Sequence, residues 1–427
     1  MRQRLQRPFY GWWIVAAAIV TQSLGSALLQ QSFGTYVVLL SKEFGWSRTA
    51  LSGAFSLARG EDGLLGPLEG WLLDRFGPRT VMQVGFVLFA LGFVLFARIE
   101  TITGFYVTFL LMSVGASMAG FLAITTAIVN WFVRRRSLAM GIALLGNPIG
   151  GYALPLIVDA LETYGWRAVA DVSAVVVLVV GLGVSQLVRH RPEQYGYLPD
   201  GDPPAPPPVE GSARALTAED TSFTVKEALR TRAFWFISLA HGASVLVVSV
   251  TQVHYTAHVI ERFGISLTAA AALITLQTTT NFVSRPLGGW LSDKISSRNV
   301  IMIAMVMHSV ALLMLAFGTS LWMVAGFALL NGFAWGARVP VVVSMRAEYF
   351  GSRSFGAIMG LSSMVVTAGS VAGPVLAGLS YDITGSYEFG FTVLAILAGL
   401  GTFFLVFTPP PTARPESAPR DLGVPLH

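Results

Sequence analysis

The sequence predicts an all-α membrane protein built from two similar halves of six helices each. Hydrophobic residues make up 54% of the 427 residues and charged residues 12%, whereas a soluble domain carries roughly a quarter charged residues. Apolar segments of about 20 residues, the length that crosses the hydrocarbon of a bilayer, recur along the chain. We expect twelve membrane-crossing helices, at approximately 10–38, 48–73, 80–97, 103–131, 138–161, 168–188, 233–261, 267–292, 299–317, 320–349, 356–382 and 388–408.

Basic residues between these segments predict the orientation. Lys and Arg favour cytoplasmic loops, and most of the 28 in this chain fall on one set of alternating connections. The opposite connections hold only Lys42, Arg48, Arg98, Arg167 and Arg262. We therefore expect both termini in the cytoplasm, while Arg59, Arg285 and Arg338 fall inside predicted spans.

A central segment, 189–232, divides the chain. It is rich in proline and charge without apolar periodicity, which predicts a flexible cytoplasmic linker. The N-terminal half is then 1–188, the C-terminal half 233–408 and the cytoplasmic tail 409–427. Residues 224–232 form either a short interfacial helix or a charged loop end.

The two halves are copies of one another. When the first half is shifted by 219 residues without a gap, identical residues recur at matching positions. The same shift holds along a stretch of more than a hundred residues. The pairs include Phe44 with Phe263, Pro67 with Pro286, Gly70 with Gly289, Asp74 with Asp293, Arg134 with Arg353, Gly141 with Gly360 and Pro155 with Pro374. A parallel repeat of this kind predicts a substrate site between the halves, near the middle of the membrane.

A charged motif ends the second span of each half. The first copy contains Gly70, Asp74, Arg75, Gly77 and Arg79. The second contains Gly289, Asp293, Lys294 and Arg298, with Ser296 in place of the later glycine. With twelve spans, this motif resembles the loop signature of the major facilitator superfamily. We expect these acids and bases to have a gating role: they pair with neighbouring helix ends in one state and release them in another. The alternative is that the motif is a helix-stopping turn with snorkelling arginines.

Three stretches resemble the monocarboxylate porters and oxalate:formate antiporters within that superfamily. They are "YGWWIV" at 10–15, "NWFVRRRSLAMGIALLGNPIGG" at 130–151 and "NFVSRPLGG" at 281–289. The resemblance implies transport of a small organic anion, with Arg285 as the partner of its carboxylate. Proton-coupled members have an aspartate where this chain has Asn281 and a lysine where it has Gln31, so their proton switch cannot operate here. The predicted eleventh span also lacks the lysine of the oxalate exchanger, which favours a monoanion over oxalate.

The residues themselves also point to Arg285. A charge deep in a span costs roughly 2.5 to 3.5 kcal/mol on insertion scales and normally faces a polar partner or aqueous cavity. Gln277 and Asn281 lie two turns and one turn before Arg285, on the same helical face. Guanidinium matches a carboxylate with two parallel hydrogen bonds. The alternative is that Arg285 pairs with an acid on another helix or reaches the cytoplasmic interface.

Arg59, Glu61 and Asp62 lie near the middle of the second span. A carboxyl group in an apolar bundle can bind and release a proton near neutral pH, because burial disfavours its charged form. Glu61 or Asp62 is therefore a candidate proton carrier, with Arg59 nearby. The alternative is an ion pair between Arg59 and Asp62 that is purely structural.

Other polar residues are weaker candidates for the substrate site. His254 and His258 share a face of the seventh span and contact substrate or protons, or are packing residues. Asn331, Trp335 and Arg338 form a stripe on the tenth span, and Arg338 needs a partner such as Glu61, Asp62 or the substrate. Gln30 and Gln31 are neutral cavity donors or face the surface. The sequence suggests no role for His241 and His308.

Several function classes are excluded. The sequence contains no phosphate-binding glycine loop, nucleophile elbow or metal-ligand cluster, so we expect no enzyme activity, no ATP-driven pumping, no cofactor and no metal. The basic excess suits anionic lipid rather than nucleic acid. We expect a monomeric secondary transporter of small organic anions, most simply a monocarboxylate, in the cell membrane. Rocker-switch proton symport is the first expectation; carboxylate antiport, efflux of drug-like metabolites and a non-transporting carboxylate sensor are the alternatives.

Overall fold

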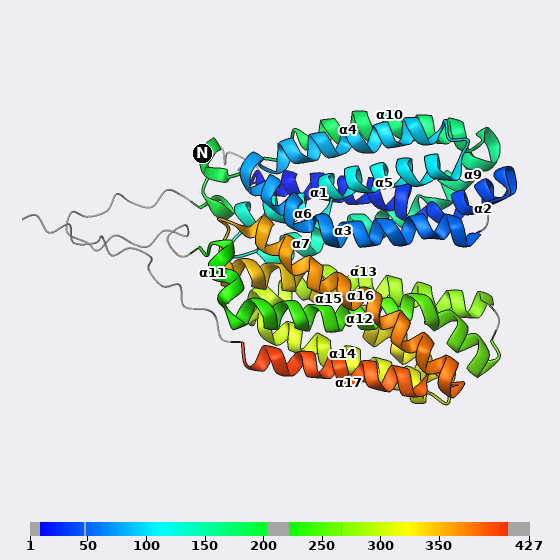
Figure 1. The fold of residues 1–427 in the computed structure, drawn as a ribbon. Helices are drawn as coiled ribbons and strands as arrows, with labels where there is room; N and C mark the ends of the chain where they lie inside the picture. The colour runs from blue at the N-terminus through cyan, green and yellow to red at the C-terminus, as the bar shows by residue number, and fades with distance from the viewer. Residues whose placement is uncertain (1–8, 47, 203–221, 266, 409–427) are drawn as a thin grey trace, which may run out of the picture.

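The structure, a computed structural model, consists of two helical bundles that lie side by side (Figure 1). It describes residues 9–46, 48–202, 222–265 and 267–408, and these contain no strand. The two chain ends and residues 203–221 of the linker lie outside the described residues, and so does the predicted tail at 409–427.

The first bundle contains ten α-helices and one π-helix. They are α1 (Gly11–Gly25), the π-helix η1 (Ser26–Gln31), α2 (Phe33–Phe44), α3 (Arg48–Phe76), α4 (Pro78–Phe96), α5 (Ile102–Ala119), α6 (Phe121–Trp131), α7 (Arg136–Ala143), α8 (Gly146–Tyr152), α9 (Leu154–Tyr164) and α10 (Trp166–Ser185). The second bundle contains α12 (Arg232–Phe263), α13 (Leu267–Lys294), α14 (Ser297–Phe317), α15 (Leu321–Phe350), α16 (Phe355–Thr384) and α17 (Glu388–Val406).

Ten segments among the described residues are helical, long and apolar enough to cross a membrane. The second and eighth predicted spans, α3 and α13, are not among them. Both are long helices, of 29 and 28 residues, but both carry the charged motifs and many further polar side chains. These charged and polar side chains lower the mean hydropathy of both helices.

Three predicted spans are interrupted helices rather than continuous ones. The first changes to π-helix at Ser26–Gln31, and the Ser32 hydroxyl donates to the Ala27 carbonyl at 2.6 Å, which satisfies an acceptor inside that distorted turn. The fourth breaks at Gly120, whose φ of −88° and ψ of −131° are not helical. The fifth breaks after Ala143 and again at Ala153. Such breaks in membrane helices need neighbouring groups to satisfy the freed backbone.

The linker contributes short helices on one end of the molecule. They are the 3₁₀ turns η2 (Pro192–Tyr195) and η3 (Pro199–Gly201), followed by α11 (Val225–Arg230). The Thr224 side chain and the Glu227 side chain cap α11 reciprocally, which is the capping box expected of such a sequence. Of the two alternatives for 224–232, the helix is therefore present.

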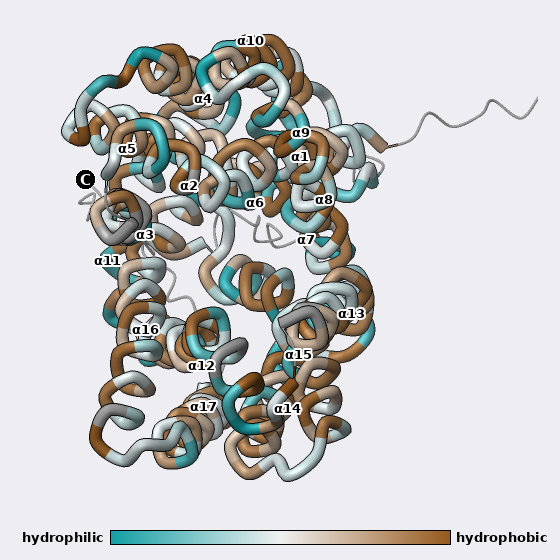
Figure 2. Tube along the Cα trace, turned by 90° about the vertical axis from the view of Figure 1, so that its right-hand side faces the viewer, coloured by the Kyte–Doolittle hydropathy of each residue, from teal (hydrophilic) through white to brown (hydrophobic). Residues whose placement is uncertain are grey.

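The halves meet through two equivalent helix pairs. One is α3 with α16 and the other is α7 with α13, as Figure 2 shows from the end opposite the linker. Gly66 lies against Gly360 in the first pair, and Gly141 lies against Arg285 in the second. In contrast, α8 and α9 continue from α7 by packing on α1 and η1 of their own half. The α7–α13 contact therefore involves the linker-side part of the fifth predicted span.

Candidate functional site

Arg285 lies where α13 of the second half meets α7 of the first. Its side chain is buried, and its Nε donates to Asn281 Oδ1 at 3.0 Å. Its Nη1 donates to the backbone carbonyl of Leu144 in the other half. Leu144 follows the last residue of α7, where a helix leaves carbonyls without intrahelical donors and favours a cation. Arg285 thus caps a helix end across the two halves.

A close backbone approach fixes this geometry. A methyl group at Gly141 would lie 2.5 Å from the Arg285 carbonyl oxygen, so α7 can lie this near α13 only with glycine at that position. The glycine-rich sequence after Arg136 therefore brings the α7 end within reach of the guanidinium. This contact joins two segments that are more than a hundred residues apart.

Asn281 has unused hydrogen-bonding capacity beside Arg285. Its Nδ2 is buried and has no hydrogen-bond partner among the residues that the structure describes. Gln277 lies one turn earlier on α13 and is half-buried. Arg285 and Asn281 are therefore neighbours, as the spacing predicts, and together they offer donors to an anion.

The stripe on α15 surrounds a second buried guanidinium. Arg338 has no exposed surface, and its Nε, Nη1 and Nη2 have no hydrogen-bond partner within the described part of the chain. Its guanidinium carbon lies 5.1 Å from the ring centroid of Trp335. The suggested pairing with Glu61 is not present in this conformation, and the Asp62 side chain lies outside the described residues.

Sequence reasoning missed the residues that accompany Arg338. His308 on α14 places its Nδ1 2.8 Å from Asn331 Oδ1. Arg346, two turns after Arg338, donates to Ser362 Oγ at 2.7 Å and to His241 Nδ1 at 3.1 Å. The histidines lie on different helices from the arginines, so no spacing along the sequence could have joined them.

His254 and His258 are bonded to protein groups within the second half. His254 has Tyr387 Oη 3.2 Å from Nδ1 and the Pro374 carbonyl 3.0 Å from Nε2. His258 is buried, with its Nε2 3.0 Å from the Leu315 carbonyl. These contacts favour the packing alternative.

Gln30 and Gln31 belong to the π-helix of the first predicted span. Both side chains are exposed, and Gln30 Oε1 accepts from Asn147 Nδ2 of α8 at 3.4 Å. Gln31 lies beside Gly151 of α8. The two glutamines therefore lie within the first half and do not reach Arg285.

The charged residues in the middle of α3 lie near the other half. Gly63, directly after them, packs against Thr367 of α16. Arg59 is exposed and Glu61 is half-buried. Arg59, one turn before Gly63, shares the face that meets α16, whereas Glu61, two residues before Gly63, points about 200° away from it. The position of the Asp62 carboxylate is outside the described residues.

The two motif aspartates bond to the starts of helices in the opposite half. Asp74 accepts from the backbone N–H groups of Gly356 and Ala357 at 3.1 and 3.0 Å. Asp293 accepts from the Leu138 N–H at 3.3 Å. Asp74 and Asp293 lie beyond the apolar parts of α3 and α13. Each faces the first turn of a helix in the other half, α16 or α7, where a negative charge is favoured. Burial raises the pKa of each carboxyl to about 6, against the effect of these hydrogen bonds.

The motif arginines bond within their own halves. Arg79 donates to the carbonyls of Gln186 and Val188, at 2.7 and 2.9 Å, just after α10. Arg298 donates to the Val406 carbonyl at the end of α17. Arg75 is exposed, 5.6 Å from the Trp71 ring centroid, and Lys294 is also exposed at the end of α13.

The difference between the two motifs has a backbone cause. Gly77 has a φ of +77°, a conformation that favours glycine. Ser296, at the matching position, has a φ of −93° and accepts from the Asn299 N–H at 3.2 Å. The second copy thus replaces a left-handed glycine turn by a serine cap, which still starts the next helix.

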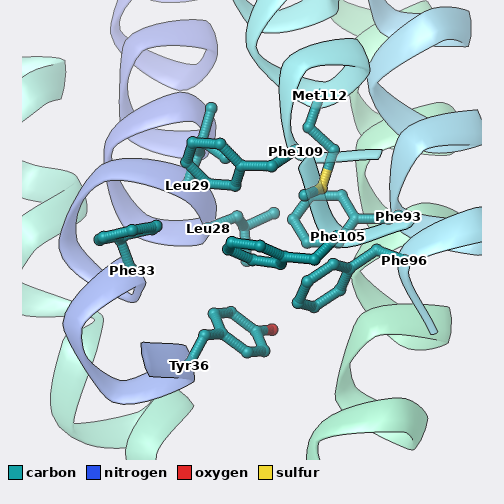
Figure 3. Close-up of a pocket in the computed structure, with 9 residues that line it drawn as sticks. All are labelled: Leu28, Leu29, Phe33, Tyr36, Phe93, Phe96, Phe105, Phe109 and Met112. Atoms are coloured by element: carbon teal, nitrogen blue, oxygen red, sulfur yellow. The ribbon is translucent and has the colours of Figure 1, made fainter. Parts of the chain in front are cut away.

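An apolar pocket lies inside the first half, next to the π-helix (Figure 3). Aromatic and aliphatic side chains from the first span, α4 and α5 surround it: Leu28, Leu29, Phe33, Tyr36, Phe93, Phe96, Phe105, Phe109 and Met112. It leaves space for about one water molecule. It is therefore too small for an organic substrate.

These features define a class of protein. Two repeated bundles of apolar helices, with cations and polar donors where the bundles meet, are typical of a membrane transporter with its site between halves. The sequence profile of the Major Facilitator Superfamily matches residues 14–259 and 237–426. The chain belongs to this superfamily. It is a multi-pass transporter of the cell membrane and not an enzyme.

Individual relatives agree with this assignment. Monocarboxylate transporter 13 of Bos taurus is 27% identical over 418 residues, which cover 95% of this chain and 92% of the relative. The oxalate:formate antiporter of Oxalobacter formigenes is 24% identical over 416 residues, covering 95% and 93%. The crystal structure of the human organic anion transporter MFSD10 has the same fold, with a TM-score of 0.67 and 18% identity over 93% of this chain and 98% of that one.

Proposed function

We propose that this transporter carries small monocarboxylates by alternating access, with Arg285 as the receptor for the carboxylate. The observation that carries the proposal is the bond from Arg285 to the Leu144 carbonyl across the two halves. A carboxylate takes two parallel hydrogen bonds from a guanidinium, so an incoming substrate competes with Leu144 for the same donors. Substrate binding then releases the end of α7 from α13 and couples binding to movement of the halves.

Asn281 extends the proposed site. Its unpartnered Nδ2 can donate to the second carboxylate oxygen or to a substituent on the neighbouring carbon. One guanidinium with neutral amide donors suits a single negative charge better than two. Gln277, one turn further along α13, then lies nearest the carbon skeleton and contributes to its selection.

The names of the relatives support the substrate class. Both a monocarboxylate transporter and an oxalate:formate antiporter align with nearly the whole chain. A small organic anion is the chemistry that these names share. Their identities to this chain are low, so the choice among anions rests on the site itself.

We also propose that α3 and α13 cross the membrane, which makes twelve spans with both termini in the cytoplasm. Helix α3 packs along α16, and α13 packs along α15. Their polar side chains can therefore face protein rather than lipid. The linker then lies on the cytoplasmic side, and the α3–α16 and α7–α13 contacts close that side. The conformation is accordingly open to the outside, and one chain forms a complete transporter.

Proton symport is the coupling that we propose. Asn281 and Gln31 do not titrate, so the carboxyl groups of α3 are the candidate carriers. Glu61 is half-buried, and both of its carboxylate oxygens are buried, so movement of the helices around α3 can change their access to water. A change in access between two states is what a coupling proton requires.

Purified protein in liposomes tests the proposed function. We expect saturable uptake of a labelled small monocarboxylate, such as formate, acetate or lactate, driven by an inward proton gradient. Uptake only against internal anion would identify an exchanger. Saturable binding with no accumulation would identify a sensor, and transport of amphipathic compounds with no carboxylate uptake would contradict the proposed substrate class.

A further inference from the structure

The second half contains a buried positive charge that no described group neutralises. All three nitrogens of Arg338 are buried without a hydrogen-bond partner, and the side chain has no exposed surface. Removing one partner from a buried charged pair is strongly destabilising, because it leaves the other charge uncompensated. Such a group is expected to have a partner, and no described residue supplies it.

Two further unpartnered polar atoms belong to Asn331, on the same face of α15 as Arg338, and to His308, which bonds to Asn331. Asn331 Nδ2 and His308 Nε2 are buried and have no hydrogen-bond partner in the described ranges. Asn331 Oδ1 only accepts, so His308 Nδ1 donates to it. Arg338 is near enough to His308 for its charge to act on that ring. The donors of Arg338 and Asn331 therefore belong to one face of α15, with the His308 ring of α14 next to Asn331.

Arg346 adds a second positive charge to the same region. It acts electrostatically on Arg338, although it is two turns away along α15. Its Nη2 donates to Ser362 Oγ and to His241 Nδ1, both of them neutral acceptors. No described carboxylate forms a salt bridge with either arginine.

We propose that a small monovalent anion binds to Arg338 and Asn331, beside the rings of Trp335 and His308. The guanidinium and the Asn331 amide supply hydrogen-bond donors, and the anion compensates the charge that the protein leaves uncompensated. A halide or the carboxylate of a very small acid has this chemistry. We call this place the Arg338 site.

The Arg338 site is separate from the proposed substrate receptor. Gly336 faces α13, since a methyl group there would collide with the Asn281 carbonyl oxygen. Arg338 follows two residues later, a rotation of about 200° around the helix. Its side chain therefore leaves α15 on a different side from Arg285 and lies among α14, α15 and α12. The inference holds whether or not Arg285 binds substrate.

The Trp335 side chain lies on the access route that we propose for the Arg338 site. It is half-buried, whereas Asn331 and Arg338 on the same stripe are fully buried. Its ring lies over the guanidinium, where a cation and an aromatic face attract each other. Rotation of this one side chain opens Arg338 toward the exposed side of Trp335.

Thermal unfolding of the detergent-purified protein tests the proposal without requiring transport. We exchange gluconate for chloride, bromide or formate at constant ionic strength and measure the midpoint. An anion that binds the folded state raises the midpoint in a saturable manner, by roughly a few degrees at tenfold excess over its Kd. Stabilisation by halides identifies a free inorganic anion as the occupant, and stabilisation by formate alone identifies a carboxylate.

Variants locate the effect. Arg338→Met keeps the length of the side chain and removes the charge, and we expect it to lose the anion-dependent shift. Asn331→Leu should weaken the apparent affinity severalfold. Arg262→Met, which removes an exposed arginine paired with Glu388, and Arg285→Met should both retain the halide shift.

Two results would overturn the proposal. One is a midpoint in the unsubstituted protein that is the same in gluconate, chloride, bromide and formate. The other is a shift that persists unchanged in both Arg338→Met and Asn331→Leu. The first needs no variant, so poor folding of Arg338→Met cannot leave the inference untested.

Discussion

Arg285 and Arg338 are two buried guanidinium groups of one half, and they differ in what surrounds them. Arg285 bonds to a side chain on its own helix and to a carbonyl of the other half. Arg338 has only the Trp335 ring and polar atoms that do not bond to it. The first is therefore placed to sense movement between halves, and the second to hold an anion within one half.

Replacement of Arg285 by lysine tests the receptor. Arg285→Lys keeps the charge but loses the planar fork that grips a carboxylate, so we expect uptake of the monocarboxylate to fall at least about tenfold, the effect of one charge-assisted hydrogen bond. Initial uptake rates are measured at matched protein content in liposomes. The control is Arg167→Lys, at an exposed arginine that pairs with Glu43. An unchanged Km in Arg285→Lys would remove this residue from the site.

The carboxyl groups of α3 carry the prediction on coupling. Glu61→Gln or Asp62→Asn, whichever removes the carrier, should abolish uptake driven by a pH gradient and spare exchange of labelled for unlabelled substrate, because exchange needs no net proton release. Proton flux and labelled acid are followed together in both variants and in the double variant. Full gradient-driven uptake in the double variant would show that Arg59, Glu61 and Asp62 are a structural cluster.

The sequence predicts some of these residues and not others, for a physical reason. Arg285, Asn281 and Gln277 share one helix, so helical periodicity alone places them together. Arg338 is visible as a charge in an apolar span, and Arg346 follows it two turns later on the same helix, but His308 is joined to this group only by the packing of α14 on α15. Contacts between helices cannot be derived from spacing along one of them.

At the scale of helices, the motif aspartates act on elements that are not their own. Asp74 bonds to the start of α16 and Asp293 to the start of α7. Each acid therefore ties the second span of one half to the fifth span of the other. The repeat predicts that the two motifs are equivalent, while the helix that each one caps becomes known only from the fold.

Neutralising Asp74 should weaken one of these ties. The amide of Asp74→Asn can accept only one of the two N–H bonds, so we expect interconversion to slow by about tenfold, the effect of one lost hydrogen bond to a charged group, with substrate binding retained. The chain has no cysteine, so spin labels at Tyr164→Cys and Ile383→Cys, both exposed, report the distance between halves. Loss of equilibrium binding with normal interconversion would contradict a gating role.

Acidification should favour the conformation described. The pKa of Asp74 and of Asp293 is about 6 here and returns toward its usual value near 3.9 when the carboxyl meets water. Between these values this conformation binds more protons, so lowering the pH from 7 to 5 stabilises it and raising the pH through 6 removes that advantage. The same label pair measures the populations. A response of equal size in the Asp74→Asn, Asp293→Asn double variant would assign it to other groups.

Helix boundaries show where sequence reasoning loses detail. All the helical regions are predictable from apolar runs, and α12 to α17 lie close to the expected ranges. The breaks in the first, fourth and fifth spans were not predicted. They depend on groups elsewhere that donate hydrogen bonds to the freed backbone carbonyls, such as Ser32 to Ala27 and Arg285 to Leu144, and no local sequence pattern reveals such a donor in advance.

At the scale of the molecule, the two pairs of helices that join the halves are related by the internal repeat but are chemically unequal. The shift of 219 residues carries Gly66 onto Arg285 and Gly141 onto Gly360. On one flank, Gly66 lies against Gly360, two residues without side chains. On the other flank, the counterpart of Gly66 is an arginine that grips the opposing helix end.

The two flanks are therefore held together differently. One is closed by close packing of the α3 and α16 backbones, and the other by the hydrogen bond from Arg285 to the Leu144 carbonyl. The glycine flank is closed by backbone packing, by Ser363 and Thr367, and by the bonds of Asp74 to Gly356 and Ala357, and none of these contacts offers a cation to a carboxylate. In the function proposed above, the arginine flank separates when the carboxylate of a solute replaces the Leu144 carbonyl as the acceptor of Arg285. An uncharged molecule of the same shape offers no such acceptor, and we expect it not to be transported.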